Sequence, residues 1–248
     1  MKTSRISFAE RQPRGSCRIG SPRIAGSRRG FTLLELLVVI AIILTCAGLV
    51  FPVISKIRGR ADGIKCANNL KQIGAATMLY AGDNNGALPG PIWSAQMATC
   101  PNYATANYEL MYFLAPYLGP YGPPVPPYLP ASSAWYSAIF ECPSARKVIL
   151  AQHRSLTDGL HFFAPSYPSP SGSALNPFGY PPVPPAGLIQ PMRLVTLVGV
   201  QNIVALEDLD QKTPYGVGSQ TVAAAPVHGS YRNKLYFDGH VQPIPIKP

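Results

Sequence analysis

The residues that could do chemistry lie together near the N-terminus, in the stretch Arg28-Arg29-Gly30-Phe31-Thr32-Leu33-Leu34-Glu35. Gly30 is a small residue of the kind found at processing sites. Glu35 is a single carboxylate at the start of an apolar run. Placing a charged side chain at the centre of a membrane helix costs about 2.5–3.5 kcal/mol, and such a group usually has a partner. Cleavage after Gly30 would create such a partner, the α-amino group of Phe31 on a neighbouring subunit.

The apolar run behind Glu35 is long enough to cross a membrane. The nineteen residues from Leu36 to Ile54 carry no charged side chain. At about 1.5 Å per residue, a helix over this stretch is about 28 Å long, close to the thickness of a hydrocarbon core. An ordinary signal peptide is cut after its apolar segment, whereas cleavage after Gly30 would remove residues 1–30 and keep the helix.

Most of the net charge of +10 lies in the basic leader, residues 1–30, which holds eight Lys or Arg and one acid. A basic flank beside an apolar helix stays in the cytoplasm. We therefore expect a single-pass protein of the inner (cytoplasmic) membrane, with its C-terminal domain periplasmic or extracellular. Because the charge is explained as a topology signal, we expect no nucleic-acid partner.

The segment Gly30–Glu35 and the apolar run resemble the signal of type IV prepilins and type II secretion pseudopilins. The resemblance implies that a prepilin peptidase cuts after Gly30, that Phe31 is N-methylated, and that Glu35 sets the subunit register in a filament. It also implies other partners: pilin-like subunits of the same or another kind, an assembly ATPase and a platform protein in the membrane.

A second pattern near the C-terminus, His228 followed by nine residues and then Asp238-Gly239, resembles the H-x9-D-G signature of a prepilin-associated family. In a hairpin, Asp238 would accept hydrogen bonds from turn amides, Gly239 would take a positive φ, and His228 would bind a loop carbonyl. Major pseudopilins carry calcium in a C-terminal loop, which makes calcium a candidate cofactor. The candidate oxygen ligands are Glu207, Asp208, Asp210 and Asp238.

We expect an α+β, pilin-like fold in which a long N-terminal helix packs on a C-terminal antiparallel sheet. A transmembrane and assembly helix at 31–55 continues as an amphipathic helix at 56–82, and Gly82–Gly86 ends it. The predicted buried face of the second part holds Ala67, Leu70, Ile73, Gly74, Thr77, Tyr80 and Ala81, and the opposite face holds Lys65, Asn68 and Gln72.

Residues 83–191 are predicted to be loop-rich, with a short helix at Tyr108–Leu118. Pro-Pro-Val-Pro-Pro occurs at 123–127 and 181–185, which favours stiff surface loops over a polyproline ligand. Residues 192–248 are predicted to form the sheet. Its expected strands are Arg193–Val200, Asn202–Leu206, and a hairpin of Lys234–Phe237 and His240–Ile244 joined by a type I′ turn at Asp238-Gly239.

Three cysteines, Cys66, Cys100 and Cys142, lie outside both the leader and the apolar run, and we expect one disulfide among them without choosing the pair. The sequence has no C-x-x-C, and none of its four histidines has a metal-ligand spacing, so neither a zinc ribbon nor a thioredoxin-type site is supported. It also lacks a nucleophile elbow and a phosphate-binding loop, and we expect no enzyme.

The sequence thus predicts a pilin-like structural subunit that is cut by prepilin peptidase and assembled through its N-terminal helix into a type II secretion pseudopilus. Two alternatives stay open. One is a subunit of a surface type IV pilus, for adhesion or DNA uptake. The other is a monomeric, membrane-anchored periplasmic binding protein that only shares the signal.

Overall fold

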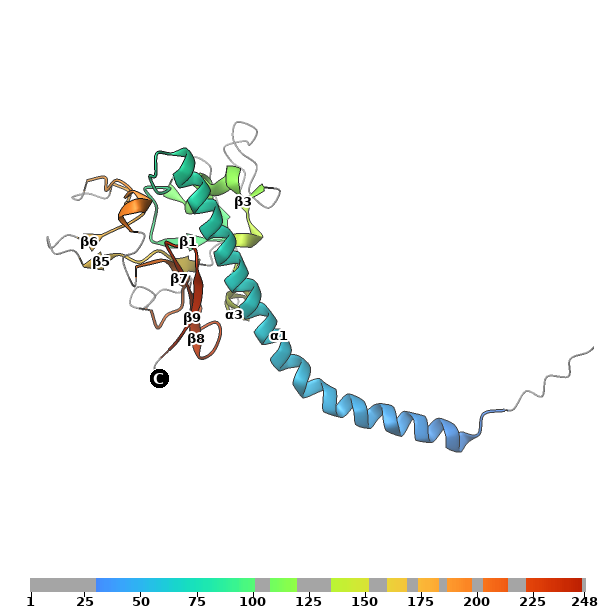
Figure 1. Cartoon of the computed structure of the whole chain (residues 1–248). Coiled ribbons are helices and arrows are strands. Elements are labelled where there is room, and N and C mark those ends of the chain that lie inside the picture. The colour runs from blue at the N-terminus through green and yellow to red at the C-terminus, as the bar shows by residue number, and fades with distance from the viewer. Residues whose placement is uncertain are drawn as a thin grey trace, which may run out of the picture. The chain divides into compact units, whose positions relative to one another are not determined.

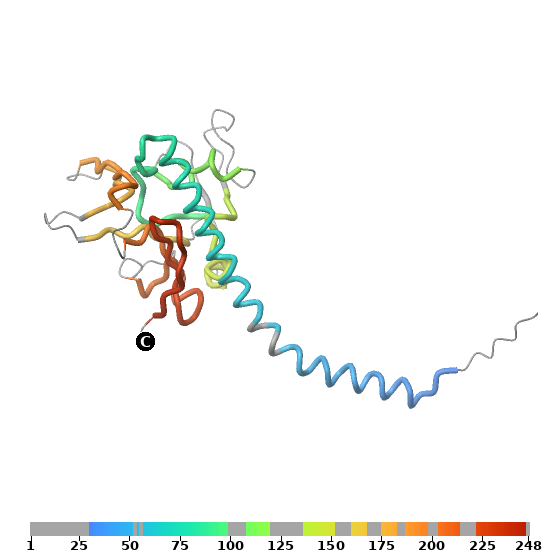
Figure 2. Tube along the Cα trace, viewed as in Figure 1, coloured from blue at the N-terminus to red at the C-terminus, as the bar shows by residue number. Residues whose placement is uncertain are grey.

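The computed structural model describes residues 30–100, 108–119, 135–151, 160–168, 174–182, 187–197, 203–213 and 222–246 (Figures 1 and 2). The chain divides into two compact units, Met1–Leu49 and Val50–Pro248. The helices and strands are α1 (Leu33–Asp83), β1 (Ala95–Met97), β2 (Thr99–Cys100), α2 (Leu110–Leu114), η2 (Ala115–Tyr117), β3 (Trp135–Tyr136), η4 (Ala138–Phe140), α3 (Pro143–Ala151), β4 (Leu160–Phe163), β5 (Tyr167–Pro168), β6 (Ala174–Leu175), η6 (Leu194–Thr196), β7 (Val204–Asp208), β8 (Tyr231–Tyr236) and β9 (Val241–Pro245). Residues 1–29 of the leader and the first Pro-Pro-Val-Pro-Pro lie outside the described residues, as does most of the second Pro-Pro-Val-Pro-Pro.

The long helix α1 ends where the sequence predicts a stop. Asn85 and Gly86 have positive φ values of 55° and 81°. The backbone N–H of Gly86 donates to the carbonyl of Ala81 at 2.7 Å, which closes the last turn. Left-handed residues of this kind commonly terminate helices and satisfy their last carbonyls.

The C-terminal part of α1 buries one face in the main hydrophobic core. The core residues that it supplies include Cys66, Leu70, Ile73 and Ala76. The predicted amphipathic pattern is confirmed: Gly74, Thr77 and Ala81 are also buried, Ala67 and Tyr80 are half-buried, and Lys65, Asn68 and Gln72 are exposed. Apolar side chains at helical spacing therefore pack this part of α1 against the sheet.

A five-stranded sheet in the order β1-β4-β7-β8-β9 faces this helix, and each of its neighbouring strand pairs is antiparallel. Leu206 of β7, Leu235 of β8 and Phe162 of β4 join the same core as α1. Figure 2 shows the C-terminal hairpin of β8 and β9 beside the second part of the helix. The predicted α+β class, with a long N-terminal helix and an antiparallel sheet, is confirmed.

Several predictions of individual elements need correction. Two of the five strands, β1 and β4, come from residues 83–191, which are predicted only to be loop-rich. The predicted strand at Arg193–Val200 is instead a 3-10 turn, η6, over its described part, because Leu194 N–H donates to Gly86 O at 2.7 Å and Arg193 binds Asn85 O. The short helix at Tyr108–Leu118 is confirmed as α2 and η2.

The predicted hairpin is confirmed, but its turn has another geometry. Tyr236 N–H donates to His240 O at 3.0 Å, and Gly239 N–H donates to Tyr236 O at 2.9 Å, so three residues form the loop. Gly239 has φ +85°, and Asp238 is not among the positive-φ residues that a type I′ turn would need. The loop is therefore a type I turn with a bulge glycine, and its tip lies against Met78 of α1.

We predict that Gly239→Ala lowers the free energy of unfolding by about 1–2 kcal/mol, the cost of a left-handed conformation for an L-residue. A Cβ at this position would also lie 2.6 Å from Met78 Cε, so that flexible side chain would have to move. Urea unfolding of the full-length protein in detergent, followed by tryptophan fluorescence, measures the change.

Gly59→Ala is the matched control. Gly59 lies within α1, and a Cβ there meets nothing within 4 Å. Alanine is the better helix former by about 0.8–1.0 kcal/mol, so this variant should be neutral or more stable. Equal unfolding midpoints for Gly239→Ala and the wild type would contradict the proposed strain at the hairpin tip.

Candidate functional site

The predicted processing site lies just before the first turn of α1. Gly30, Phe31 and Thr32 precede the helix and are all exposed, with Phe31 80% exposed. A Cβ at Gly30 would meet nothing within 4 Å. The Gly30–Phe31 peptide bond therefore lies in open, non-helical backbone, which a peptidase can bind in an extended conformation.

Thr32 and Glu35 cap the N-terminus of α1 in a reciprocal capping box. Glu35 Oε2 accepts hydrogen bonds from the backbone N–H and the hydroxyl of Thr32, each at 2.9 Å. The backbone N–H of Glu35 in turn donates to Thr32 Oγ1 at 3.2 Å. This pattern satisfies amide donors that the first turn of a helix leaves open. The sequence prediction assigned Glu35 an intersubunit role and missed this local one.

The apolar run after Glu35 is exposed in the single chain. Leu33–Phe51 is a span of 19 residues with mean hydropathy 2.8, and none of it is buried. Its length and composition are sufficient for a membrane crossing. The side chains of this span are thus available to lipid and to helices of other subunits.

The four acids proposed as calcium ligands have separate partners. Glu207 pairs with Lys234 at 2.8 Å, and Asp210 binds the guanidinium of Arg232 through two bonds of 2.7 and 2.8 Å. At the hairpin tip, Asp238 Oδ1 accepts from the His240 backbone at 3.1 Å, as predicted for a turn cap. Asp208 belongs to a different cluster, described next. The structure does not bring these four carboxylates together, and calcium binding stays a prediction.

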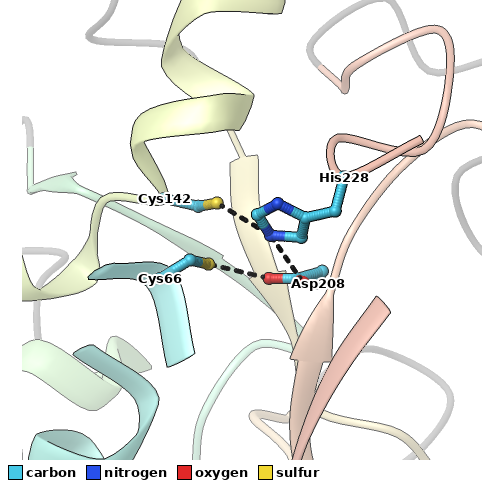
Figure 3. Close-up of side chains that lie close together, drawn as sticks. All are labelled: Cys66, Cys142, Asp208 and His228. Atoms are coloured by element: carbon cyan, nitrogen blue, oxygen red, sulfur yellow. Dashed lines mark hydrogen bonds and ion pairs between the residues drawn. The ribbon is translucent and has the colours of Figure 1, made fainter. Parts of the chain in front are cut away.

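A buried cluster joins Asp208 to His228, Cys66 and Cys142 (Figure 3). One ligand-type atom from each side chain lies within 4.8 Å of all the others. His228 Nε2 is 3.1 Å from Asp208 Oδ2 and 3.5 Å from Cys142 Sγ. The Cys66 thiol donates to Asp208 Oδ1 at 3.1 Å. His228 therefore binds a carboxylate and a thiol, and the predicted bond to a loop carbonyl is corrected.

Four different elements hold this cluster in place. Cys66 lies on the buried face of α1, Cys142 directly precedes α3, Asp208 ends β7, and His228 lies in the loop before β8. Asn69, one turn after Cys66, donates through Nδ2 to the carbonyls of Ala138 and Glu141 at 3.0 and 2.8 Å. These bonds fix the segment that carries Cys142 against α1.

The loop that carries His228 approaches α1 very closely. The imidazole stacks on Tyr231, with ring centroids 5.1 Å apart. A Cβ at Gly63 of α1 would lie 2.3 Å from the Tyr231 hydroxyl and 3.5 Å from His228 Nδ1. A larger residue at position 63 would displace the Tyr231 side chain that stacks on His228, so Gly63 leaves room for this stacked pair beside α1.

The electrostatics of the cluster follow from burial and close approach. Burial raises the pKa of the Cys66 thiol, and the neighbouring Cys142 and Asp208 raise it further. Burial alone would lower the pKa of His228, but its hydrogen bonds and charge interactions with Asp208 and Cys142 outweigh that effect and raise it to about 10. Without an ion, His228 is therefore protonated at neutral pH and pairs with the Asp208 carboxylate.

The disulfide predicted among Cys66, Cys100 and Cys142 is not formed. Cys66 and Cys142 are both free thiols. Any disulfide among the three cysteines would need at least one of these two. The physical reason is that both sulfurs take part in contacts with Asp208 and His228. No local sequence pattern indicates this cluster, because its members come from positions 66, 142, 208 and 228.

Comparison with known proteins gives one family match. Residues 26–51 match the model of the prokaryotic N-terminal methylation motif. No curated protein and no solved structure matches the chain. The matched segment contains Gly30, Phe31, Glu35 and most of the exposed apolar span. The match supports a type IV pilin-like protein: a membrane-anchored, single-pass structural subunit that is a substrate of prepilin peptidase and assembles with other pilin subunits.

Proposed function

We propose that this protein is a subunit of a type II secretion pseudopilus, cut after Gly30, N-methylated on Phe31 and assembled through the first part of α1. The observation that carries the proposal is the methylation motif at residues 26–51, which precedes and overlaps an exposed apolar helix. The prepilin peptidase, the assembly ATPase and the membrane platform protein are the partners that this function requires.

Glu35 is suited to join one subunit to the next. A carboxylate has about four lone-pair sites, and the capping box with Thr32 uses two of them on Oε2. The remaining sites can accept hydrogen bonds from the α-amino group of Phe31 on a neighbouring subunit while the cap is kept. Pairing would neutralise both charges where the apolar span meets lipid, and it would fix the axial register between helices.

We predict that Glu35→Ala and Glu35→Gln are inserted and processed normally, but that both reduce assembly at least about tenfold, because both lose the charge that pairs with Phe31. Glutamine at this helix position still supports a capping box, so Glu35→Gln separates the intersubunit charge from the local cap. Crosslinking of the apolar helix to other copies of itself in intact membranes measures assembly.

Thr32→Val serves as the matched control, because it removes the hydroxyl of the cap and keeps the carboxylate. It should assemble far better than Glu35→Gln. If Glu35→Gln assembles as well as the wild type and only Glu35→Ala fails, the cap explains the phenotype and the charge pairing is excluded.

We further predict that cells lacking this protein retain in the periplasm proteins that they normally export, and that mechanical shearing of wild-type cells releases no long filaments containing it. Comparing secreted, periplasmic and sheared fractions with an antibody against the protein tests both points. Long sheared filaments built from it would instead identify a surface type IV pilus. A complete lack of crosslinks between subunits would identify a membrane-anchored monomer.

A further inference from the structure

The geometry points to a zinc-binding site formed by Cys66, Cys142, Asp208 and His228. These residues supply two thiols, one carboxylate and one imidazole, which are all established types of zinc ligand. The inference does not depend on the proposed function, because the cluster lies outside the matched N-terminal segment. Within the described part of the chain, it is the only group of three or more such side chains close enough to hold one ion.

The spacing of the four ligand atoms suits a tetrahedral ion. Zinc lies about 2.3 Å from sulfur and about 2.0–2.2 Å from nitrogen or oxygen, so neighbouring ligands in a tetrahedron are roughly 3.3–3.8 Å apart. The observed separations are 3.1 Å from Cys66 Sγ to Asp208 Oδ1, 3.1 Å from His228 Nε2 to Asp208 Oδ2, and 3.5 Å from Cys142 Sγ to His228 Nε2. Cys66 and His228 contact different oxygens of Asp208, and the four ligand atoms all lie within 4.8 Å of one another. Shifts of up to about 1 Å would therefore bring every pair to tetrahedral separation.

The number of groups that meet at His228 Nε2 also favours a cation over simple hydrogen bonding. His228 Nε2 has one position for a proton, yet both Asp208 Oδ2 and Cys142 Sγ lie within bonding distance of it. Figure 3 shows the four side chains pointing toward one another from separate elements. One zinc ion can bind all four atoms at once, which one proton cannot do.

The site is closed, as a structural zinc site should be. Cys66, Cys142 and Asp208 are each 0% exposed, and the His228 side chain is 1% exposed. Structural sites have four protein ligands, whereas catalytic sites keep one position for water or substrate. The backbone N–H of Asn233 donates to Asp208 Oδ2 at 2.7 Å and holds the carboxylate in position, as outer partners of metal ligands commonly do.

Binding would release the Nε2 proton of His228 and the thiol protons of Cys66 and Cys142 to solvent, so that three lone pairs and the carboxylate bind the ion. Zinc would then link α1 to the segment before α3, to the end of β7 and to the loop before β8. The ion would thus crosslink α1 to the rest of this unit.

The first test is the zinc content of the full-length protein, purified in detergent from membranes without chelator. We expect about one zinc per chain in the wild type, and less than a tenth of that in the double variant Cys66→Ser/Cys142→Ser. Cys46→Ser is the matched control, because Cys46 is an exposed free thiol on α1, and it should keep the wild-type content.

The second test replaces zinc by Co²⁺ in the same full-length protein and records the absorption spectrum. Two thiolates in a tetrahedral site should give strong sulfur-to-cobalt charge-transfer bands, and His228→Gln should weaken Co²⁺ binding at least tenfold. His240→Gln is the control, because His240 is exposed and pairs with Asp238 outside the cluster. Thermal unfolding is then compared with and without zinc. Relative to the protein with free zinc at roughly a thousandfold its dissociation constant, the zinc-free protein should have a Tm lower by about 8–16 °C.

Two results would overturn the site. One is a wild-type zinc content equal to that of the double serine variant, which would show that the bound metal is adventitious. The other is a Cys66–Cys142 disulfide, found by peptide mapping of the protein as isolated. Because zinc content and Co²⁺ spectra are measured on detergent-solubilised single chains, neither result bears on cleavage after Gly30 or on filament assembly.

Discussion

One helix, α1, has to satisfy two different surroundings, and the rest of the structure follows from that constraint. From Leu33 to Phe51 none of its side chains is buried by its own chain, so lipid or neighbouring subunits must cover them. From Cys66 onward, one face lies in the core of the second unit. The hydrophobic effect thus acts on the same helix twice, first between molecules and then within one.

The polar groups of α1 make hydrogen bonds both at the start of the helix and in its buried part. At its start, the capping box of Thr32 and Glu35 satisfies amides that lipid could not hydrate. In its buried part, Asn69 donates to two carbonyls, and Cys66 donates to Asp208. Buried polar groups must find partners, so these contacts select one position of the helix on the sheet as well as stabilising it.

Most of the elements predicted correctly from the sequence have local signals. The apolar span, the amphipathic face around Leu70 and Ile73, the helix stop at Gly86 and the hairpin at Asp238-Gly239 all depend on residues a few positions apart. Sequence reasoning failed where partners are distant. Strand β4 is short and pairs with β1 and β7, both far from it in sequence. The region after Arg193 has the composition of a strand, but contacts with Asn85 and Gly86 hold its described part in a turn.

The same distinction explains the candidate sites. Gly30, Phe31 and Glu35 are recognisable because their spacing is fixed along one stretch of chain. The cluster of Cys66, Cys142, Asp208 and His228 is not, because only the packing of α1 against the sheet brings these residues together. His228 belongs to both the C-terminal signature and the cluster, and it pairs with Asp208, whereas Asp238 of the signature pairs with His240.

The central claim is that the apolar part of α1 remains in the mature protein after the leader is removed. Mass spectrometry of the intact protein isolated from membranes, and of its N-terminal peptide, tests it most directly. The account predicts a chain that begins with N-methylated Phe31. A chain that begins before Arg28, or beyond Ile54, would contradict it.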